Sequence, residues 1–537
     1  MTKTKLECGC EFEFNDKGEP IIDYNLDSVN LQCPLIWDLI SSGRTTGLFQ
    51  IDSGLGQMMS KKLQPRNIEH LAALISIMRP SCLQGKMEDG KSIADHYIDR
   101  KNGVEPIKVE YEPLKEILKD NYQMMIYQED ALKIAQEIAG FNLQKADDLR
   151  RAIGKKKADL MAKLEKEFVE GCSKLGKVTD EQAKQIFGQI KASQRYSFNR
   201  SHAVSYALMT YLTAIPKVHA SKRFYKSWLN HSCDKIKPLD EVKHLVADAR
   251  TFNVDICNPD IRLKNENFKI IDGRIFFGLQ HIKGVGEAAI KSLLGLIDAL
   301  DLNNTSWSQL LFGTLLKVNK TIVKNTIATG CFDYLKMSRE QMLFEHDTAL
   351  KLTKKEVEWI RNNLDLSKYA GILDILNEIL SKEPGKGQAL SNKNRKNIVK
   401  GLQSAVVKPP FNVKNSSIAR ICALETSYLG TTLSCHKVDE VQHDLADTTI
   451  KEYNDGKEGI MKFIVQINKI KENISKKNGL AMAFLAVEDA TDSTEGVVAF
   501  NNVWENNKAV LFEGNTILMV CKKSDKGSLI ILSCKSI

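Results

Sequence analysis

The spacing of apolar residues changes along this chain, and the change divides it into a helical part and a strand-rich part. Between residues 112 and 232 apolar side chains recur at every third or fourth position, which is the spacing of amphipathic helices. Between residues 458 and 537 they alternate with polar side chains in short runs, which is typical of strands. A chain of 537 residues is too long for one hydrophobic core, so we expect roughly three or four domains.

Several helices are predicted in the helical part, with Gly140, Gly154 and Gly176 at helix ends. Pro216 is expected to kink or split the last of them, because proline lacks the backbone N–H that a helix interior uses. The predicted ranges are 114–118, 130–139, 143–153, 158–175, 181–193 and 203–229.

Shorter elements are predicted outside this part. Residues 1–33 are expected to hold short strands, and residues 45–50 an extended segment. Asp272-Gly273 stands between two apolar runs, which is a strong signal for a β-hairpin. The alternating runs near the C-terminus indicate a small five-stranded barrel, with strands predicted at 461–467, 482–487, 497–500, 516–521 and 528–533.

The composition excludes some classes of protein. With 43% hydrophobic and 27% charged residues, the chain has the composition of a soluble globular protein. No apolar run reaches the length of a membrane span, about 18 residues, so no membrane partner is expected. The N-terminus lacks the apolar core of a secretion signal, which favours a cytoplasmic location. The net charge of +9 favours a polyanionic partner.

Twelve cysteines are scattered over the chain, as expected for the reduced thiols of a cytoplasmic protein. Only Cys8, Cys10 and Cys33 suggest metal ligands. One Cys-x-Cys pair and a distant third cysteine lack the paired spacing of a zinc ribbon, so no metal site is predicted.

The segment 149–157 is the most strongly basic feature of the chain, with five cations in nine positions. Arg150 and Arg151 offer forked donors for phosphate oxygens, and Lys155, Lys156 and Lys157 add point charges. Gly154 separates the two groups and could free backbone N–H groups to face an anion. The segment therefore indicates a site for a ligand with several phosphates, and the alternative is a solvated basic face.

A second polar segment strengthens the phosphate interpretation. His202 follows Arg200 and Ser201, close to Asn199 and Phe198. A single histidine is more often structural than catalytic, but neighbouring cations and hydroxyls suit a phosphate pocket better than a core. No Walker loop and no Gly-x-Ser-x-Gly or His-Glu-x-x-His motif occurs in the chain.

Residues 282–286 read Ile-Lys-Gly-Val-Gly directly before an amphipathic helix. Gly284 and Gly286 would let the backbone approach a phosphate closely, and Lys283 would add a salt-dependent contact. This is the form of a helix-hairpin-helix, which holds nucleic-acid backbone without reading sequence. The alternative is a helix start without a ligand. Residues 318–330 are a candidate for the second hairpin of a tandem pair.

The predicted barrel would suit single-stranded nucleic acid, whose bases stack on exposed aromatic rings. Its candidate aromatics are assigned instead to the core, because aromatic residues at strand spacing usually pack there; they are Phe463, Phe484, Phe500 and Trp504. Residues 341–344 resemble a tag for a sliding clamp, but they lie on a helical pattern, so core packing is favoured.

Ten segments, in this order, resemble the alpha subunit of bacterial DNA polymerase III, the family C replicative polymerase, with the bacteriophage version nearest. They are residues 45–53, 73–80, 95–103, 114–122, 126–130, 134–140, 148–157, 198–206, 282–287 and 428–436. The resemblance covers nearly the whole chain from about residue 26, and a match in so many parts is highly specific.

The resemblance implies a multidomain, mainly α-helical protein with a helical fingers domain, helix-hairpin-helix elements and a C-terminal five-stranded OB-like β-barrel. The implied domains are a palm-proximal remnant at 1–90, fingers at 91–235, a duplex-binding domain with helix-hairpin-helix at 236–345, a helical connector at 346–457 and an OB-fold-like domain at 458–537.

The resemblance also implies two sets of binding residues. The nucleotide-binding residues would be Tyr127, Gln128, Arg150, Arg151, Lys155, Lys156, Lys157, Asn199, Arg200, Ser201 and His202. The DNA-binding residues would be Arg79, Lys283, Gly284 and Gly286.

The chain departs from the family in its acidic residues. Family members hold two Mg²⁺ ions with an Asp-x-Asp pair and a third aspartate of the palm, and no Asp-x-Asp precedes Thr45. Asp23 is a candidate for the third acid, and the alternative is a surface turn. No other catalytic residue is predicted in this chain.

The resemblance therefore implies a split DNA polymerase of a bacterial or phage-infected cell. An N-terminal polymerase fragment with the palm would be the partner and would bind most of the Mg²⁺. The other implied partners are a DNA primer-template, deoxynucleoside triphosphates and a sliding clamp. The alternatives are a non-enzymatic DNA-binding or replisome-scaffold protein, and an incomplete gene product without a role of its own.

Overall fold

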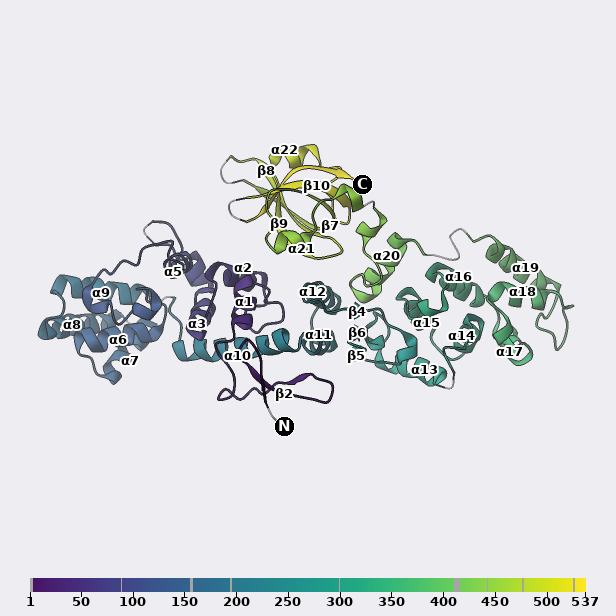
Figure 1. Cartoon of the computed structure of the whole chain (residues 1–537), viewed down its shortest axis with the longest axis horizontal. Helices are drawn as coiled ribbons and strands as arrows, with labels where there is room; N and C mark the ends of the chain where they lie inside the picture. Colours follow the sequence, from purple (N-terminus) through teal and green to yellow (C-terminus); the bar gives the residue numbers. More distant parts are fainter. Residues whose placement is uncertain are drawn as a thin grey trace. The chain divides into compact units, whose positions relative to one another are not determined.

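The structure is a computed structural model, and helices predominate in it (Figure 1). It describes residues 3–87, 89–154, 158–193, 196–298, 300–409, 416–441, 443–475, 478–524 and 527–537. The chain separates into two compact units, Met1–Ser221 and Lys222–Ile537. Within the described ranges, none of the helices has the length and apolar character needed to cross a membrane.

Unit 1 begins with a small sheet and five helices. The sheet has the strand order β1 (Thr4–Lys5), β2 (Glu11–Phe14) and β3 (Pro20–Ile21). The helices are α1 (Pro34–Ser42), α2 (Gly54–Leu63), α3 (Ile68–Ile77), α4 (Pro80–Gln84) and α5 (Ile93–Lys101). The sheet confirms the short strands predicted for residues 1–33.

The segment 45–50 between α1 and α2 was predicted to be extended, and this prediction is wrong. The segment is a series of turns. Its start is held by the buried Lys217, whose Nζ donates to the carbonyls of Arg44 at 2.9 Å and Thr46 at 2.8 Å. The buried Thr45 hydroxyl also donates to the carbonyl of Ile51. The contacts of Lys217 come from more than 170 residues away, so local spacing could not reveal them.

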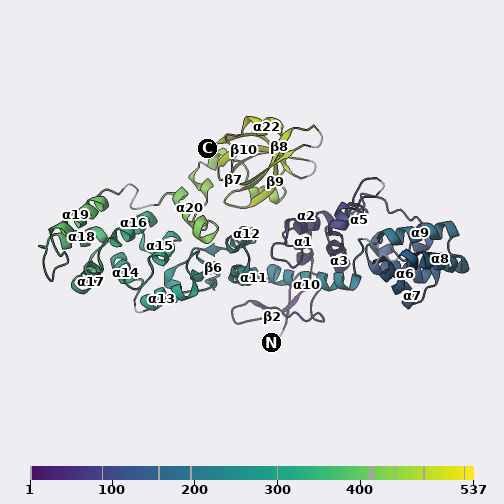
Figure 2. The same ribbon diagram turned by 180° about the vertical axis from the view of Figure 1, so that it is seen from behind.

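Four helices of unit 1 pack around one core and confirm the predicted helical ranges. They are α6 (Gln128–Ala139), α7 (Leu143–Gly154), α8 (Ala158–Leu175) and α9 (Asp180–Ser193). Their apolar stripes meet around Phe168, Ile134 and Phe187, all of which are fully buried. Figure 2 shows these four helices gathered at one end of unit 1. Amphipathic spacing predicted them well because burial of one face stabilises a helix.

Two predicted helices differ from the structure. Residues 112–121 form only two 3₁₀ turns, Glu112–Leu114 and Lys119–Asn121, and positive φ angles at Tyr122 and Gln123 end the second turn. The helix predicted at 203–229 is two helices, α10 (Arg200–His219) and α11 (Ser221–Asn230). Pro216 lies inside α10, and the break follows four residues later at Ala220.

Unit 2 continues with a mixed layer of helices and short strands. The predicted hairpin is confirmed: β5 (Lys269–Ile271) and β6 (Arg274–Phe276) are joined by Asp272 and Gly273, with φ angles of 47° and 75°. Positive φ at both positions is what a tight hairpin of this kind requires. The neighbouring elements are α12 (Pro238–Thr251) and β4 (Ile256–Cys257), which is parallel to β6.

The middle of unit 2 is helical. Its helices are α13 (Glu287–Ile297), α14 (Trp307–Thr314), α15 (Lys320–Ala328), α16 (Arg339–Ala349), α17 (Lys354–Asn363), α18 (Ile372–Leu380), α19 (Lys393–Val407) and α20 (Ile418–Leu429). A buried ion pair between Arg339 of α16 and Glu425 of α20 joins these two helices, with 2.9 Å between Nη1 and Oε1.

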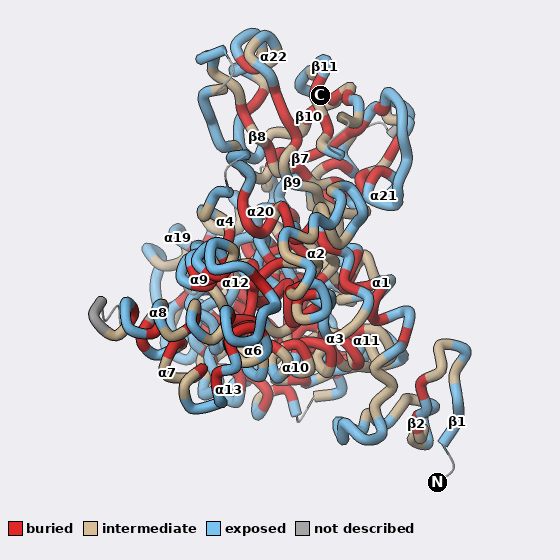
Figure 3. Tube along the Cα trace, turned by 90° about the vertical axis from the view of Figure 1, so that its left-hand side faces the viewer, coloured by how far each residue is buried: buried red, intermediate tan, exposed pale blue. Residues whose placement is uncertain are grey.

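The C-terminal strands form a closed barrel, as predicted. They are β7 (Ile460–Ile474), β8 (Ala481–Glu488), β9 (Ser493–Ala499), β10 (Thr516–Lys523) and β11 (Leu529–Ser536), in the order β10-β11-β9-β8-β7 with β7 closing onto β10. The pair β11–β9 is parallel and the others are antiparallel. Buried residues of all five strands form one core, and Figure 3 shows buried positions along these strands. The predicted fold class, mainly α with an OB-like barrel, is confirmed.

Candidate functional site

The first turns of α6 and α10 lie side by side, although about seventy residues separate them in sequence. Tyr127 and Phe198 form a parallel β-bridge just before the two helices. The N–H of Phe198 donates to the carbonyl of Ile126, and the N–H of Gln128 donates to the carbonyl of Phe198, each at 2.9 Å. The structure therefore brings together two of the segments that the sequence predicted to share one pocket.

Glu129 joins the starts of α6 and α10 through hydrogen bonds. Its carboxylate accepts hydrogen bonds from the Asn199 side-chain amide at 2.8 Å and from the backbone N–H of Arg200 at 2.9 Å. Asn199 in turn caps α10, because its Oδ1 accepts from the N–H of His202 at 2.8 Å. The two helix starts are held in one arrangement by Asn199, a predicted site residue, and by Glu129, which the sequence analysis had not singled out.

Asp130 holds the backbone of the junction through hydrogen bonds. Its Oδ2 accepts from the N–H groups of Ile126 at 3.0 Å and Tyr127 at 2.9 Å, and its Oδ1 accepts from Asn121. Burial raises the pKa of this carboxyl to about 7, because the charged form is desolvated. A buried carboxyl thus fixes the backbone that leads into α6.

The outer face of this junction is cationic and aromatic. The exposed Arg79 places its guanidinium 3.6 Å from the ring centre of Phe198. Arg200 lies 5.6 Å from the ring centre of Tyr127 and forms an ion pair with Glu69 at 3.1 Å. We name Arg79, Arg200, Ser201 and His202 the junction patch.

The predicted pocket residues take different places in the junction patch. Ser201 and His202 are exposed, and the centre of the His202 ring lies 4.1 Å from that of Tyr206, with the two rings tilted by 43°. Gln128 is half-buried. Tyr127 is only 1% exposed, so it lies beneath Arg200 and supports the surface, where the sequence had placed it as a lining residue.

Arg150 and Arg151 lie on α7, with Ala146, Leu149 and Ala152 buried on the opposite face. Both arginines hold Asp147: their Nε atoms lie 2.9 Å and 2.7 Å from its two carboxylate oxygens. Among the described residues, no hydrogen bond or ion pair joins either arginine to the junction patch. Lys155, Lys156 and Lys157 lie outside the described residues.

The predicted helix-hairpin-helix has the expected local geometry. Lys283, Gly284 and Gly286 are exposed at the start of α13, and Gly284 has a φ of 78°. Asn325 of α15 donates from its side-chain amide to the carbonyl of Lys283 at 2.8 Å. A Cβ on Gly284 would lie 2.8 Å from that amide nitrogen, so glycine is needed there for both conformation and space. The segment predicted as a second hairpin, 318–330, supplies this contact.

The barrel aromatics divide into two groups. Phe463 and Trp504 are buried, which confirms their assignment to the core. Phe500 is 49% exposed and Phe484 is partly exposed, so the core assignment is wrong for Phe500 and incomplete for Phe484. Phe500 caps the short helix α22 (Asn501–Asn506), where strand alternation has ended. In the clamp-like segment of α16, Met342 and Leu343 are buried, which confirms core packing.

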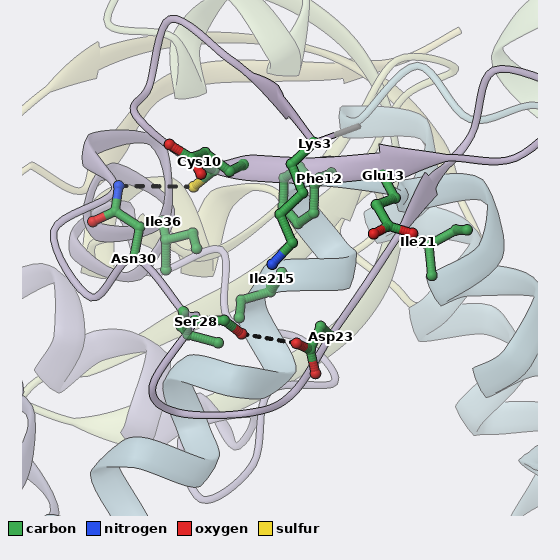
Figure 4. A pocket seen from close by; sticks show the side chains of 12 residues that line it. Lys3, Cys10, Phe12, Glu13, Ile21, Asp23, Ser28, Asn30, Ile36 and Ile215 are labelled. Atoms are coloured by element: carbon green, nitrogen blue, oxygen red, sulfur yellow. Dashed lines mark hydrogen bonds between the residues drawn. The ribbon is translucent and has the colours of Figure 1, made fainter. Parts of the chain in front are cut away.

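Asp23 lies at the edge of a cavity of about 250 Å³ beside the N-terminal sheet (Figure 4). It accepts from the N–H of Asn25 at 3.0 Å and from the Ser28 hydroxyl at 2.9 Å. These hydrogen bonds lower the pKa of Asp23. They hold the exposed side chain in a turn, and the role of Asp23 as a palm acid stays a prediction.

Comparison with known proteins agrees with these observations. The family described as the bacterial DNA polymerase III alpha subunit finger domain matches residues 13–176, and a helix-hairpin-helix motif matches residues 253–342. The first range contains α6, α7 and Arg150–Arg151, and the second contains Lys283 and Asn325.

Three relatives, each named DNA polymerase III subunit alpha, show the extent of the similarity. The protein of Aquifex aeolicus is 34% identical over 333 residues, which is 60% of this chain and 27% of that protein. The protein of Borreliella burgdorferi is 27% identical over 505 residues, 92% of this chain and 40% of that protein. The protein of Escherichia coli is 33% identical over 345 residues, 62% of this chain and 28% of that protein.

This chain thus spans 40% or less of the length of these relatives. The similarity confirms the resemblance predicted from the sequence motifs. The chain thus resembles the bacterial DNA polymerase III alpha subunit finger domain over residues 13–176, and a helix-hairpin-helix motif over residues 253–342 and a five-stranded barrel follow.

Proposed function

We propose that this chain supplies the nucleotide-binding and DNA-binding part of a replicative DNA polymerase, and that a partner chain supplies the catalytic palm. The observation that carries the proposal is the junction of α6 and α10, where residues 126–128 and 198–202 meet beside the finger helices. This surface is built from two distant segments, and its cations lie over backbone that is held by hydrogen bonds. Such a surface suits a ligand that must be bound in one orientation.

The cations of unit 1 are suited to phosphate. The guanidinium of Arg79 is stacked on Phe198, and its N–H groups carry no ion pair to any described carboxylate. Arg150 and Arg151 share one counter-ion, Asp147, on a half-exposed helix face. The two guanidinium groups share a single carboxylate. They can exchange it for the oxygens of a triphosphate, which offers more hydrogen-bond acceptors.

The described residues of this chain do not fit the metal chemistry of the reaction. Two Mg²⁺ ions that clamp the attacking and leaving oxygens need several converging carboxylates. In the described part of the chain, the single group of three or more converging acidic, histidine or cysteine ligands contains cysteines and a histidine. The palm-bearing partner would therefore provide the Mg²⁺ ligands, and this chain would position substrates, which is a large part of phosphoryl-transfer catalysis.

Contacts to DNA would come mainly from unit 2, with Arg79 of unit 1 as a further DNA-binding candidate. Lys283 and the glycine turn at the start of α13 present one cation and a helix N-terminus to a phosphate backbone. The exposed Phe500 and the partly exposed Phe484 of the barrel offer rings on which unpaired bases could stack. A sliding clamp as a further partner rests on the resemblance alone.

The proposal is tested by mixing the full chain with a palm-bearing fragment of a family C polymerase and measuring primer extension with Mg²⁺. Arg150→Ala/Arg151→Ala should raise the KM for deoxynucleotide about tenfold or more, since each charge-assisted phosphate contact contributes about 1.5–3 kcal/mol. Binding of the duplex should stay nearly the same. Lys163→Ala/Lys166→Ala on α8 is the matched control, because both lysines are exposed and face solvent.

An unchanged KM in the double arginine variant would refute the nucleotide role. The rival function is a DNA-binding scaffold without catalysis. Binding of DNA by unit 2 together with no extension in any mixture would favour that rival.

A further inference from the structure

Four potential metal ligands from three distant segments meet in unit 1. They are the Sγ atoms of Cys8, Cys10 and Cys33 and a ring nitrogen of His219, and all four lie within 4.8 Å of one another. The Cys33 Sγ lies 3.7 Å from Nε2 of His219, which is 186 residues away in sequence. We name these four residues the Cys₃His cluster.

The backbone presents each ligand of the Cys₃His cluster for a local reason. Cys8 and Cys10 flank Gly9, which has a φ of 83° in the turn between β1 and β2. This positive φ lets the chain reverse, so the two thiols face the same point. A Cβ on Gly9 would lie 3.1 Å from the side-chain amide of Asn30, so the turn also packs closely against the next segment.

The other two ligands come from helix ends. Cys33 is the residue before α1, and its N–H donates to the hydroxyl of Tyr211 at 3.2 Å. Tyr211 belongs to α10 and donates in turn to the carbonyl of Asn30 at 2.7 Å. His219 is the last residue of α10, and its ring packs 5.0 Å from that of Phe12 of β2.

We propose that Cys8, Cys10, Cys33 and His219 bind one structural Zn²⁺ ion. Three thiolates and one imidazole form one of the common tetrahedral sets for zinc, with all positions filled by protein. Tetrahedral geometry with Zn–S of about 2.3 Å and Zn–N of about 2.0 Å places sulfurs about 3.8 Å apart and sulfur and nitrogen about 3.6 Å apart. The 3.7 Å between Cys33 Sγ and His219 Nε2 fits this scale, and all four ligand atoms lie within 4.8 Å of one another. Binding would release the thiol protons to solvent.

The surroundings resemble those of a built site. The Asn30 amide points at Cys10 Sγ, with 4.0 Å between nitrogen and sulfur (Figure 4). Amide donors near thiolate sulfurs orient the ligands and spread their charge. Cys10 and Cys33 are buried, so they are shielded from solvent thiols and oxidants. A disulfide would use only two of the three sulfurs and would leave His219 without a role.

The ion would fasten the N-terminal sheet to the helices. The sheet has two strands of only two residues each, and Cys10 and Phe12 are its buried apolar side chains. Such a small core rarely holds a sheet in place, and metal binding can supply the missing folding energy. Because α10 starts at the junction patch and ends at His219, the ion would also fix the far end of the helix that carries Asn199 and Arg200.

Metal analysis of the purified full chain tests the proposal without any enzymatic assay. Expression in zinc-supplemented medium should yield about one Zn²⁺ per chain. Cys33→Ser and His219→Ala should lower the zinc content several-fold. Cys233→Ser is the matched control, because Cys233 is an exposed cysteine outside the cluster, and it should retain the metal.

A second measurement keeps the test valid if a variant misfolds. In the wild-type chain, a strong chelator should release the zinc and make three more thiols reactive toward an alkylating reagent. Proteolysis within residues 1–33 should then become faster while the barrel stays intact. Replacement of the zinc by Co²⁺ should give the visible absorption of tetrahedral thiolate coordination.

Two outcomes would overturn the zinc assignment. One is a chain without stoichiometric zinc whose three cluster thiols react freely before chelation. The other is a mass that shows a disulfide between two of the cluster cysteines. Neither outcome bears on nucleotide binding, so failure here is distinct from failure of the proposed function.

Discussion

Glu129 in the first turn of α6 accepts a 2.8 Å hydrogen bond from the side chain of Asn199, the residue that caps α10. The same carboxylate accepts from the N–H of Arg200 at 2.9 Å. One side chain therefore sets the distance between two helix starts that come from segments about seventy residues apart. The junction patch depends on this contact for its shape.

We expect Glu129→Ala to weaken nucleotide binding without removing any residue that would touch the nucleotide. Loss of the carboxylate frees the Asn199 amide and the Arg200 N–H, at a cost of about 1–3 kcal/mol. Binding of deoxynucleotide, measured by isothermal titration, should weaken several-fold. Glu137→Ala on the same helix is the control, because Glu137 is exposed and far from the helix start. Equal effects of the two variants would contradict the role of Glu129.

Asp147→Asn should strengthen binding of a triphosphate. Asp147 neutralises Arg150 and Arg151 through ion pairs of 2.9 Å and 2.7 Å, and a phosphate must displace it. Half-exposed pairs of this kind contribute about 0.2–1 kcal/mol, so affinity should rise about two- to fivefold at low salt. Asp148→Asn changes the charge equally, but Asp148 accepts from Gln144, so it is the matched control. Equal gains in both variants would point to net charge alone.

Local patterns were sufficient to predict elements whose stability comes from their own residues. The helix α8 has the predicted bounds 158–175 because its apolar stripe is regular and Gly176 follows it with a φ of 64°. The Asp272-Gly273 hairpin was predicted for a similar reason, since both residues tolerate positive φ. The barrel strands followed from alternation.

Contacts between distant residues could not be predicted in this way. The pairing of Glu129 with Asn199 and the approach of His219 to Cys33 depend on tertiary packing over 70 and 186 residues. The cysteine spacing alone predicted no metal site, because it gives no indication of the fourth ligand, His219. The ion pairs of Asp147 with the two arginines could have been predicted from the sequence. The acid stands three and four residues before the two bases on a helix, which is the spacing of such pairs.

The buried Asp130 should make the stability of unit 1 depend on pH. Burial raises its pKa to about 7 from an ordinary value of 3.8, so the folded chain retains a proton that the unfolded chain releases. This contribution is fully present below about pH 3.8 and is lost as pH rises through about 7. The loss amounts to at most about 4 kcal/mol, at 1.36 kcal/mol for each pH unit between the two pKa values.

Asp130→Asn should remove that pH dependence while keeping the backbone hydrogen bonds, since an amide oxygen can accept from Ile126 and Tyr127. Asp130→Ala leaves both N–H groups without an acceptor and should destabilise the α6–α9 core at every pH. Hydrogen–deuterium exchange of α6 amides in urea between pH 4 and 8 measures both effects. The same slope in wild type and Asp130→Asn would contradict the assignment.

Lys283→Ala should change how DNA binding depends on salt. An exposed lysine that neutralises one phosphate releases about one counterion, so its loss should reduce the slope of log K against log salt concentration by about one. Duplexes of different sequence should lose affinity equally, because a backbone contact carries no base information. Lys354→Ala on α17 is the control, since Lys354 is an exposed lysine of the same unit outside the helix-hairpin-helix segment. Fluorescence anisotropy with labelled duplexes at several salt concentrations measures the slope. If the two variants show the same slope as the wild type, Lys283 does not contact the phosphate backbone.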